Sequence, residues 1–191
     1  MNTLDPEKQF AQWFAEALAQ EGAEAARCVV ATSTPDGHPS ARIVYHRPGA
    51  SGRLRFFTNY ESRKGEELSI NPNCAVVFQW PSLGRQLRLE GTCHRVSAEE
   101  SDAYFEARDL ESQIASSRSP QSRAIESIVR LREQVSQELA HAARVQRPAH
   151  WGGYELVPER IEFWTSGKAR LHDRQLFIRH GDGWRVSQLA P

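Results

Sequence analysis

Apolar residues recur with two different periods along this chain, and the changes of period predict the order of its elements. The first predicted element is a helix, because apolar side chains follow helical spacing at positions 10, 13, 14 and 18. The pair Asp5-Pro6 is typical of a helix N-terminus, since Asp caps exposed N–H groups and the fixed φ of proline suits the first turn. We therefore predict an amphipathic helix that begins at Asp5-Pro6.

Short β-branched and apolar runs follow, and alternation of apolar and polar positions within them is typical of strands. The predicted strands cover residues 28–32, 41–46, 54–58, 74–80, 85–96, 154–157, 161–164, 175–179 and 184–187. Turn-forming residues lie between them at Pro35-Asp36-Gly37, 48–52 and 81–84, and at Asp182-Gly183 for the last hairpin.

Helices are predicted between some of these strands. Residues 62–70 are expected to form a short helix that ends before Asn71-Pro72, because a residue before proline disfavours the helical conformation. Ser97 and Glu100 have the spacing of a capping box, which predicts a helix that continues through Phe105.

The remaining central segment divides into two parts. Residues 109–120 are polar and predict a loop, whereas apolar positions at helical spacing within 125–139 predict a further helix. Short strands joined by tight turns, with helices inserted among them, indicate an antiparallel sheet or barrel. The predicted fold class is mainly β with helices, in a single domain over residues 1–191.

Composition and charge exclude several classes of protein. Lys plus Arg and Asp plus Glu each number 24, so the basic excess typical of a nucleic-acid-binding protein is absent. Apolar runs are short and no secretory signal is visible, so we expect no membrane span. Cys28, Cys74 and Cys93 are widely spaced, which favours buried thiols in a reducing cytoplasm. The histidines are scattered, and we expect no metal site.

The first cluster that could carry chemistry is Ser62-Arg63-Lys64, with Arg42 and Thr58-Asn59 upstream. Adjacent cations and hydroxyl groups at the start of a short helix suit a phosphate group. The alternative is a solvated surface turn, which an isolated triplet of this kind favours.

The second cluster lies within residues 164–174. Arg170, His172 and Arg174 alternate, so in an extended segment they would share one face. Three cationic or titratable groups on one face repel each other unless an anion lies there. The alternative is a charged edge strand in which Asp173 is the partner of these cations, and spacing alone leaves both interpretations open.

Residues 161–174 resemble the C-terminal signature of the pyridoxamine 5′-phosphate oxidase family. Further motifs follow the order found in that family, at residues 30–32, 42–44, 57–59, 62–64, 86, 104–105, 108, 112–114 and 121–122. The resemblance extends from about residue 25 to Pro191.

This resemblance implies a homodimeric, FMN-binding split β-barrel of the antiparallel Greek-key type, with each FMN between two subunits. Arg42, Arg63 and Lys64 would hold the FMN phosphate, because fixed cations replace the water around a dianion. Gln121 and Ser122 would add hydrogen bonds. The other implied cofactor-binding residues are Phe57, Thr58, Ser62, Gln86, Trp164 and Arg174.

The resemblance also implies a substrate site. The substrate phosphate would be bound by Arg47, Tyr104, Arg108 and Ser112. Arg170 and His172 would flank the substrate ring over the flavin as the catalytic pair, Arg170 by positioning and electrostatic assistance and His172 by handling a proton. The implied reaction transfers a hydride to FMN, which oxygen then reoxidises with release of hydrogen peroxide.

Three features depart from the pattern of the family. Arg47 stands where lysine is usual, and arginine is longer, planar and forked. Phe57 stands where tyrosine is frequent. The sequence starts almost at its first helix, whereas typical members carry an earlier segment that closes over the substrate, so we expect a more open site.

Three functions follow from this pattern. The leading one is oxidation of pyridoxamine or pyridoxine 5′-phosphate to pyridoxal 5′-phosphate. The second is a related FMN-dependent oxidase of another reduced ring, such as a late enzyme of phenazine synthesis, which Arg47 and the more open site favour. The third is a flavin-binding carrier or sensor without turnover.

Overall fold

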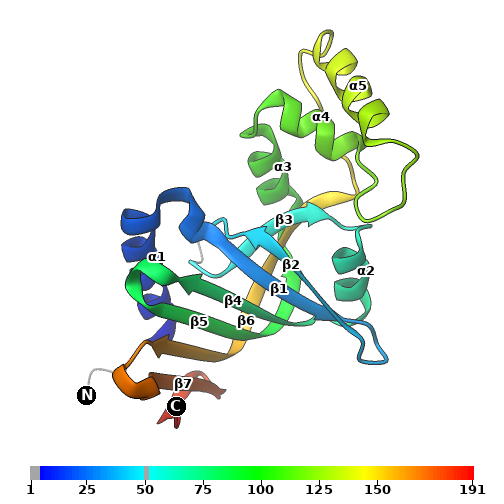
Figure 1. The fold of residues 1–191 in the computed structure, drawn as a ribbon. Coiled ribbons are helices and arrows are strands. Elements are labelled where there is room, and N and C mark those ends of the chain that lie inside the picture. Colours follow the sequence, from blue (N-terminus) through cyan, green and yellow to red (C-terminus); the bar gives the residue numbers. More distant parts are fainter. Residues whose placement is uncertain (1–4, 50–51) are drawn as a thin grey trace.

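The computed structural model describes residues 5–49 and 52–191, so residues 50 and 51 of the expected 48–52 loop lie outside the described residues. Its strands form one antiparallel sheet in the order β2-β1-β4-β5-β6-β7-β8, with β3 paired to β6 (Figure 1). The fold is therefore mainly β, as predicted. The strands are β1 (Arg27–Ser33), β2 (Pro39–Tyr45), β3 (Arg55–Asn59), β4 (Asn73–Trp80), β5 (Arg85–Arg95), β6 (Trp151–Thr165), β7 (Asp173–His180) and β8 (Gly183–Gln188).

Strand β6 corrects the prediction of two separate strands at 154–157 and 161–164. The two are halves of one long strand, and its pairing with β5 shifts register between Glu90 and Gly91. Gly91 pairs with Pro158 while Glu90 pairs with Arg160, so one residue of β6 is extra at this bulge. A Cβ atom at Gly91 would lie 2.1 Å from the carbonyl oxygen of Val157, which explains the glycine.

The predicted hairpin turns are confirmed at one position and shifted at another. The N–H of Gly37 donates to the carbonyl of Thr34 at 2.9 Å, which closes the turn predicted at Pro35-Asp36-Gly37. In the last hairpin His180 pairs with Gly183, so the turn residues are Gly181 and Asp182, one position before the prediction. Gly181 has φ +56°, the conformation that glycine adopts most easily.

Helix α1 (Pro6–Glu21) confirms the predicted first helix. The Asp5 carboxylate caps it by accepting from backbone N–H groups of its first turn. Phe10 and Phe14 are buried in the core, whereas Leu18, expected on the same apolar face, is 40% exposed.

Helices α2 (Arg63–Ile70) and α3 (Ala98–Glu106) begin and end close to the predicted positions. Ser62 caps α2, and the reciprocal bonds of the capping box between Ser97 and Glu100 are both present at the start of α3. The caps therefore fix the start of α2, which carries Arg63 and Lys64, and the start of α3, which carries Tyr104.

Residues 110–118 form a helix, α4 (Leu110–Arg118), where a polar loop was predicted. Only Gln113 and Ile114 of this helix are buried, so an apolar stripe is missing from its sequence. Packing of Ile114, together with the Asp109 cap, stabilises the helix despite that missing pattern. The next helix, α5 (Ile128–Leu139), confirms the second half of the prediction.

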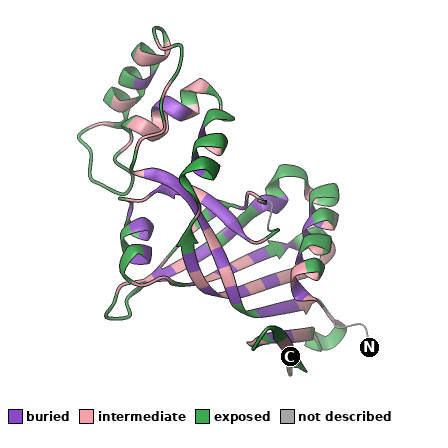
Figure 2. Ribbon diagram, turned by 180° about the vertical axis from the view of Figure 1, so that it is seen from behind, coloured by how far each residue is buried: buried purple, intermediate pink, exposed green. Residues whose placement is uncertain are grey.

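The hydrophobic core lies between α1 and the sheet, and α3, α4 and α5 stand together beyond one end of the sheet (Figures 1 and 2). His46 is buried in this core, with its ring 5.5 Å from that of Phe10, 4.8 Å from that of Phe14 and 5.9 Å from that of Phe78. Burial lowers the pKa of His46 from its usual 6.5 to about 4, so the imidazole is neutral at pH 7. None of the described helices has the length and apolar character needed to cross a membrane.

Candidate cofactor and substrate site

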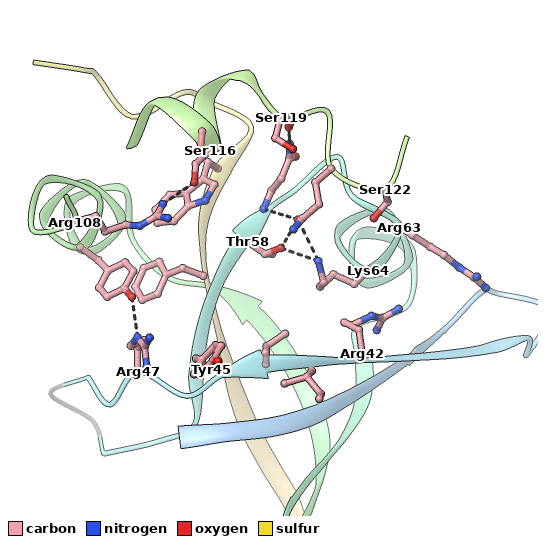
Figure 3. Close-up of a pocket in the computed structure, with 18 of the residues that line it drawn as sticks. Arg42, Tyr45, Arg47, Thr58, Arg63, Lys64, Arg108, Ser116, Ser119 and Ser122 are labelled. Atoms are coloured by element: carbon pink, nitrogen blue, oxygen red, sulfur yellow. Dashed lines mark hydrogen bonds between the residues drawn. The ribbon is translucent and has the colours of Figure 1, made fainter. Parts of the chain in front are cut away.

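A cleft of about 790 Å³ is lined by β2, β3 and the first residues of α2, together with residues of α3, α4 and the segment after α4 (Figure 3). The expected site residues that line it are Arg42, Arg47, Phe57, Thr58, Arg63, Lys64, Tyr104, Arg108, Gln121 and Ser122. The expected site residues outside its lining are Ser62, Gln86, Ser112, Trp164, Arg170, His172 and Arg174. Most of the expected site residues therefore line the cleft of a single chain, whereas those of the C-terminal signature lie outside it.

Lys64 is a buried cation in the wall of this cleft. Its ammonium group donates to Thr58 Oγ1 at 2.9 Å and to Gln121 Oε1 at 3.2 Å (Figure 3). It also donates to Ser62 Oγ at 3.2 Å. Burial, with a smaller effect from the charge of Arg42, lowers the pKa of Lys64 from its usual 10.5 to about 8. A buried ammonium group is incompatible with a solvated surface turn, so that alternative is wrong for Lys64.

Two arginines lie close to Lys64. Arg42 reaches from β2 along the sheet, and its Nη1 donates to Val30 O at 3.1 Å and to Thr32 Oγ1 at 2.7 Å. Arg63 is the exposed first residue of α2. Three cations therefore meet at one end of the cleft, which is the arrangement that a phosphate group requires.

The other end of the cleft combines cations with aromatic rings. The rings of Phe57 and Tyr104 are stacked with centroids 3.9 Å apart, and the ring of Trp151 is nearly parallel to both. Arg47 Nε donates to the Tyr104 hydroxyl at 2.8 Å, and the guanidinium of Arg108 lies 5.0 Å from the Trp151 ring centroid. Burial lowers the pKa of Arg108, which remains a cation at pH 7.

Ser116 and Trp151 are lining residues that the sequence analysis missed. Ser116 Oγ accepts from Arg108 Nη1 at 2.7 Å (Figure 3). Ser112, which was expected to bind the substrate phosphate, lies outside the cleft lining, and its backbone N–H donates to the Asp109 cap. Ser116 was missed because a loop was predicted over 109–120, and only a helix makes the position of Ser116 predictable.

The two glycines that follow Trp151 could have indicated from the sequence that side chains pack closely at this point. A Cβ atom at Gly152 would lie 2.1 Å from the Tyr60 hydroxyl, and one at Gly153 would lie 2.8 Å from the Phe57 ring. Consecutive glycines beside an aromatic residue in a strand indicate close approach of another ring, which is what the structure contains.

The expected cofactor-binding residues outside the cleft lining, apart from Ser62, form a second cluster with His172. Gln86 of β5 pairs with Trp164 of β6, which pairs with Arg174 of β7, and the His172 ring lies 4.6 Å from that of Trp164. Arg174 Nε donates to Glu162 Oε1 at 2.8 Å. Strand β7 lies at the end of the sheet remote from α3, α4 and α5 (Figure 1).

The segment from Arg170 to Arg174 is not extended throughout, so the condition under which alternation would place the three side chains on one face is not met. Residues 168–170 form a tight turn in which Ala169 has φ +53° and Arg170 has φ +65°, and β7 begins only at Asp173. The charged edge strand is wrong, because β7 pairs on both sides and the ion-pair partner of Arg174 is Glu162 instead of Asp173.

Comparisons with known proteins match nearly the whole chain. Residues 14–142 match the family described as pyridoxamine 5′-phosphate oxidase, and residues 151–191 match the pyridoxine 5′-phosphate oxidase C-terminal dimerisation region. A pyridoxine/pyridoxamine 5′-phosphate oxidase of Rubrobacter xylanophilus is 47% identical, covering 98% of this chain and 87% of that protein. One of Burkholderia cenocepacia is 46% identical, covering 98% of this chain and 89% of that protein.

Two solved structures are also similar. PhzG from Burkholderia lata, in complex with tetrahydrophenazine-1-carboxylic acid, has a TM-score of 0.92 and 30% identity, covering 98% of this chain and 93% of that one. A pyridoxamine 5′-phosphate oxidase-related, FMN-binding protein from Nostoc punctiforme has a TM-score of 0.80 and 16% identity, covering 99% of this chain and 100% of that one. The second likeness is one of fold.

Proposed function

The chain belongs to the pyridoxamine 5′-phosphate oxidase family of FMN-dependent oxidases, and from that premise we propose that it oxidises pyridoxamine or pyridoxine 5′-phosphate to pyridoxal 5′-phosphate. The observation that carries the proposal is a cleft with cations at both ends, Lys64 and its neighbours at one and Arg47 with Arg108 at the other (Figure 3). Two such ends suit a phosphorylated cofactor and a phosphorylated substrate. The names of the curated relatives support the same substrate.

The chemistry of the first end fits FMN. Lys64 is buried with neutral hydrogen-bond partners, and a phosphate dianion would offset the cost of desolvating its charge. Arg42 and Arg63 would bind the same phosphate, with hydrogen bonds from Gln121 and Ser122. FMN, when bound, supplies the capacity to accept a hydride.

The second end would bind the substrate. Arg47, Tyr104 and Arg108 would hold its phosphate, and Ser116 is placed to assist through its bond to Arg108. The ring of Tyr104 is held flat against Phe57, which limits the orientations open to the substrate phosphate. A role for Ser112 stays a prediction.

The protein is a homodimer with its dimerisation region in residues 151–191. We infer that a second copy supplies the cluster of Gln86, Trp164, His172 and Arg174, together with Arg170, to the flavin. Ile43 and Tyr45, which line the cleft, are 53% and 43% exposed in one chain, and a second copy would cover them. In that position Arg170 would orient the reacting carbon and His172 would hold or move a proton.

A second candidate function is oxidation of a reduced phenazine carboxylate. The similarity to PhzG supports it, and so does Arg47, because the planar fork of arginine binds a carboxylate with two parallel hydrogen bonds. A further observation favours the leading proposal. Both Arg47 and Arg108 point to the substrate end, and two cations match the charge of a phosphate dianion better than that of a carboxylate monoanion.

One purification and two assays distinguish these functions. We expect yellow protein that converts pyridoxamine 5′-phosphate to pyridoxal 5′-phosphate in air, with consumption of oxygen and release of hydrogen peroxide. Activity with a reduced phenazine carboxylate alone would favour the second function. Yellow protein that is inactive with both would favour a flavin carrier, and colourless protein that does not bind FMN would contradict the cofactor site.

We also propose a cytoplasmic location. Cys28, Cys74 and Cys93 are buried free thiols, which suits a reducing compartment.

A further inference from the structure

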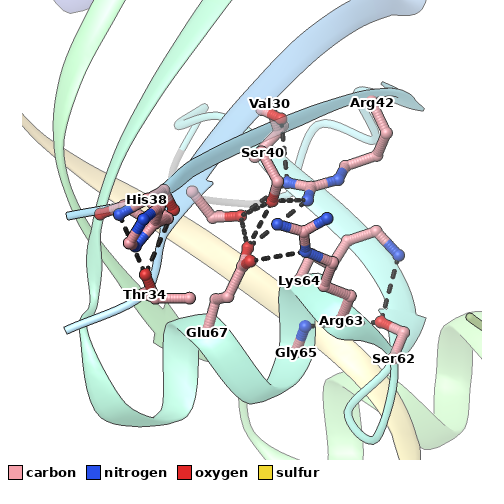
Figure 4. Close-up of polar contacts among 12 residues, drawn as sticks. Val30, Thr34, His38, Ser40, Arg42, Ser62, Arg63, Lys64, Gly65 and Glu67 are labelled. Carbon is pink, nitrogen blue, oxygen red and sulfur yellow. Dashed lines mark hydrogen bonds and ion pairs between the residues drawn. The ribbon is translucent and has the colours of Figure 1, made fainter. Parts of the chain in front are cut away.

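Glu67, which the expected site does not include, is a buried carboxylate behind the cations of the cleft. Its side chain is 5% exposed. Oε1 accepts from Arg63 Nε at 2.9 Å, and Oε2 accepts from Ser40 Oγ at 2.6 Å and from Thr32 Oγ1 (Figure 4). The carboxylate therefore joins helix α2 to strands β1 and β2.

The same two hydroxyl groups connect Glu67 to Arg42. Thr32 Oγ1 accepts from Arg42 Nη1 at 2.7 Å, and Ser40 Oγ accepts from Arg42 Nη2. A hydroxyl group has one hydrogen to donate and lone pairs with which to accept. Because each hydrogen is given to Glu67, the lone pairs are left to accept from Arg42, whose guanidinium group can only donate. The carboxylate thus orients both hydroxyl groups to accept from Arg42.

Glu67 is ionised at neutral pH. Burial by itself would raise its pKa, but hydrogen bonds from Ser40, Thr32 and Arg63 outweigh that effect and lower the pKa to about 2. With Lys64 protonated, the three cations and this carboxylate sum to a charge of +2, which matches a phosphate dianion.

We propose that Glu67 is a positioning residue of the phosphate site, which holds the guanidinium groups of Arg42 and Arg63 in the orientation that binds the cofactor phosphate. The inference rests on the proposed role of those two arginines. Without the carboxylate, Arg63 would lose its acceptor and Arg42 would lose the carboxylate oxygen that lies 3.5 Å from its Nη2. The two guanidinium groups and the Lys64 ammonium group would then repel one another. Glu67 itself lies behind them and needs no contact with the phosphate.

The alternative is that Glu67 only fastens α2 to the β1–β2 hairpin. The two roles differ in which ligand they affect. A positioning role concerns the phosphate alone, whereas a loosened α2 would weaken binding of FMN and riboflavin alike, since the two differ only by that phosphate. A pure charge effect has the opposite sign, because removal of a carboxylate makes the site more positive and would tighten FMN binding.

The test is the affinity of the Glu67→Gln homodimer for FMN and for riboflavin, measured by quenching of flavin fluorescence on titration of the apoprotein. We expect the dissociation constant of FMN to rise about tenfold or more, the size of a lost charge-assisted hydrogen bond, with riboflavin affinity unchanged. The matched control is Glu61→Gln, which removes the same charge from an exposed residue next to the start of α2 and should leave both affinities unchanged.

Ser40→Ala provides a second variant with no change of charge. It removes one of the two hydroxyl groups between Glu67 and Arg42, so FMN affinity should again fall while riboflavin affinity stays the same. Equal losses for both flavins, or unchanged or tighter FMN binding by Glu67→Gln, would overturn the inference. If the unaltered protein itself binds FMN no better than riboflavin, it is the proposed phosphate site that fails.

Discussion

Arg47 Nε donates a hydrogen bond of 2.8 Å to the hydroxyl group of Tyr104, and the Tyr104 ring is stacked on Phe57. The bond joins a residue just after β2 to a residue of α3, so two of the groups proposed to hold the substrate phosphate are positioned in advance. Such positioning reduces the entropy lost when the substrate binds.

Replacement of Arg47 tests this arrangement. We expect Arg47→Met to raise KM for pyridoxamine 5′-phosphate about tenfold or more, because one charge and the bond to Tyr104 are lost, while kcat changes less. Arg47→Lys keeps the charge and should have a smaller effect. Steady-state kinetics with unphosphorylated pyridoxine provide the control, and an equal rise in KM for that compound would argue against phosphate recognition by Arg47.

The serine that assists Arg108 can be identified by comparing two variants of α4. Ser116 Oγ accepts from Arg108 Nη1 at 2.7 Å, so Ser116→Ala should raise KM for the phosphorylated substrate several-fold, about the effect of one hydrogen bond. Ser112→Ala should have less effect, provided that α4 keeps its position when substrate binds. The reverse ranking would restore the role that the sequence suggested for Ser112.

Binding of FMN should weaken in alkaline solution because of Lys64. The pKa of Lys64 is about 8 in the empty site, and the negative charge of the phosphate would raise it in the complex, so binding takes up a proton above pH 8. We expect FMN affinity to be constant near pH 7 and to fall by up to about tenfold per pH unit above pH 8. Lys64→Ala should abolish retention of FMN.

Riboflavin is the control for this pH dependence, since it lacks the phosphate and its affinity should not change between pH 7 and 9. Titrations of the apoprotein at several pH values provide the measurement. FMN affinity that stays constant to pH 9 would show that Lys64 does not bind the phosphate, as would a Lys64→Ala protein that is purified fully yellow.

Stability in acid should depend on His46. Its pKa is about 4 in the folded protein and 6.5 when exposed, so between these values the unfolded chain binds a proton that the folded chain excludes. The free energy of unfolding should therefore fall as pH decreases from 6.5 to 4, by up to about 3 kcal/mol from this residue. Urea denaturation of His46→Leu should lack this part of the pH dependence, and identical pH profiles for the two proteins would contradict it.

Local chemistry along the chain was sufficient to predict most elements. The Asp5 cap, the Ser62 cap and the capping box of Ser97 with Glu100 all form as expected, because each bond joins residues only two or three positions apart. Helix α4 was missed for the opposite reason, since Ile114 stabilises it through packing and provides no periodic pattern.

The cations at one end of the cleft were likewise expected from the sequence, where adjacent cations at a helix start suggested a phosphate group and resemblance to a known family assigned it to FMN. Arg42, Arg63 and Lys64 all line one cleft. Glu67 was not identified, although it lies on the same helix as Lys64, because its partners Thr32 and Ser40 reach it only after β1 and β2 pack against α2.

The sequence by itself therefore determined most of the elements, their caps, and the cations that line one end of the cleft, since these depend on neighbouring residues or on motifs that persist in a family. Only the tertiary structure decided that Ser116 and Trp151 enter the cleft, that Glu67 lies behind its arginines, and that Arg170 and His172 lie outside the lining of that cleft. The physical reason is that these relationships join residues far apart in the chain, and strand pairing and helix packing set them together.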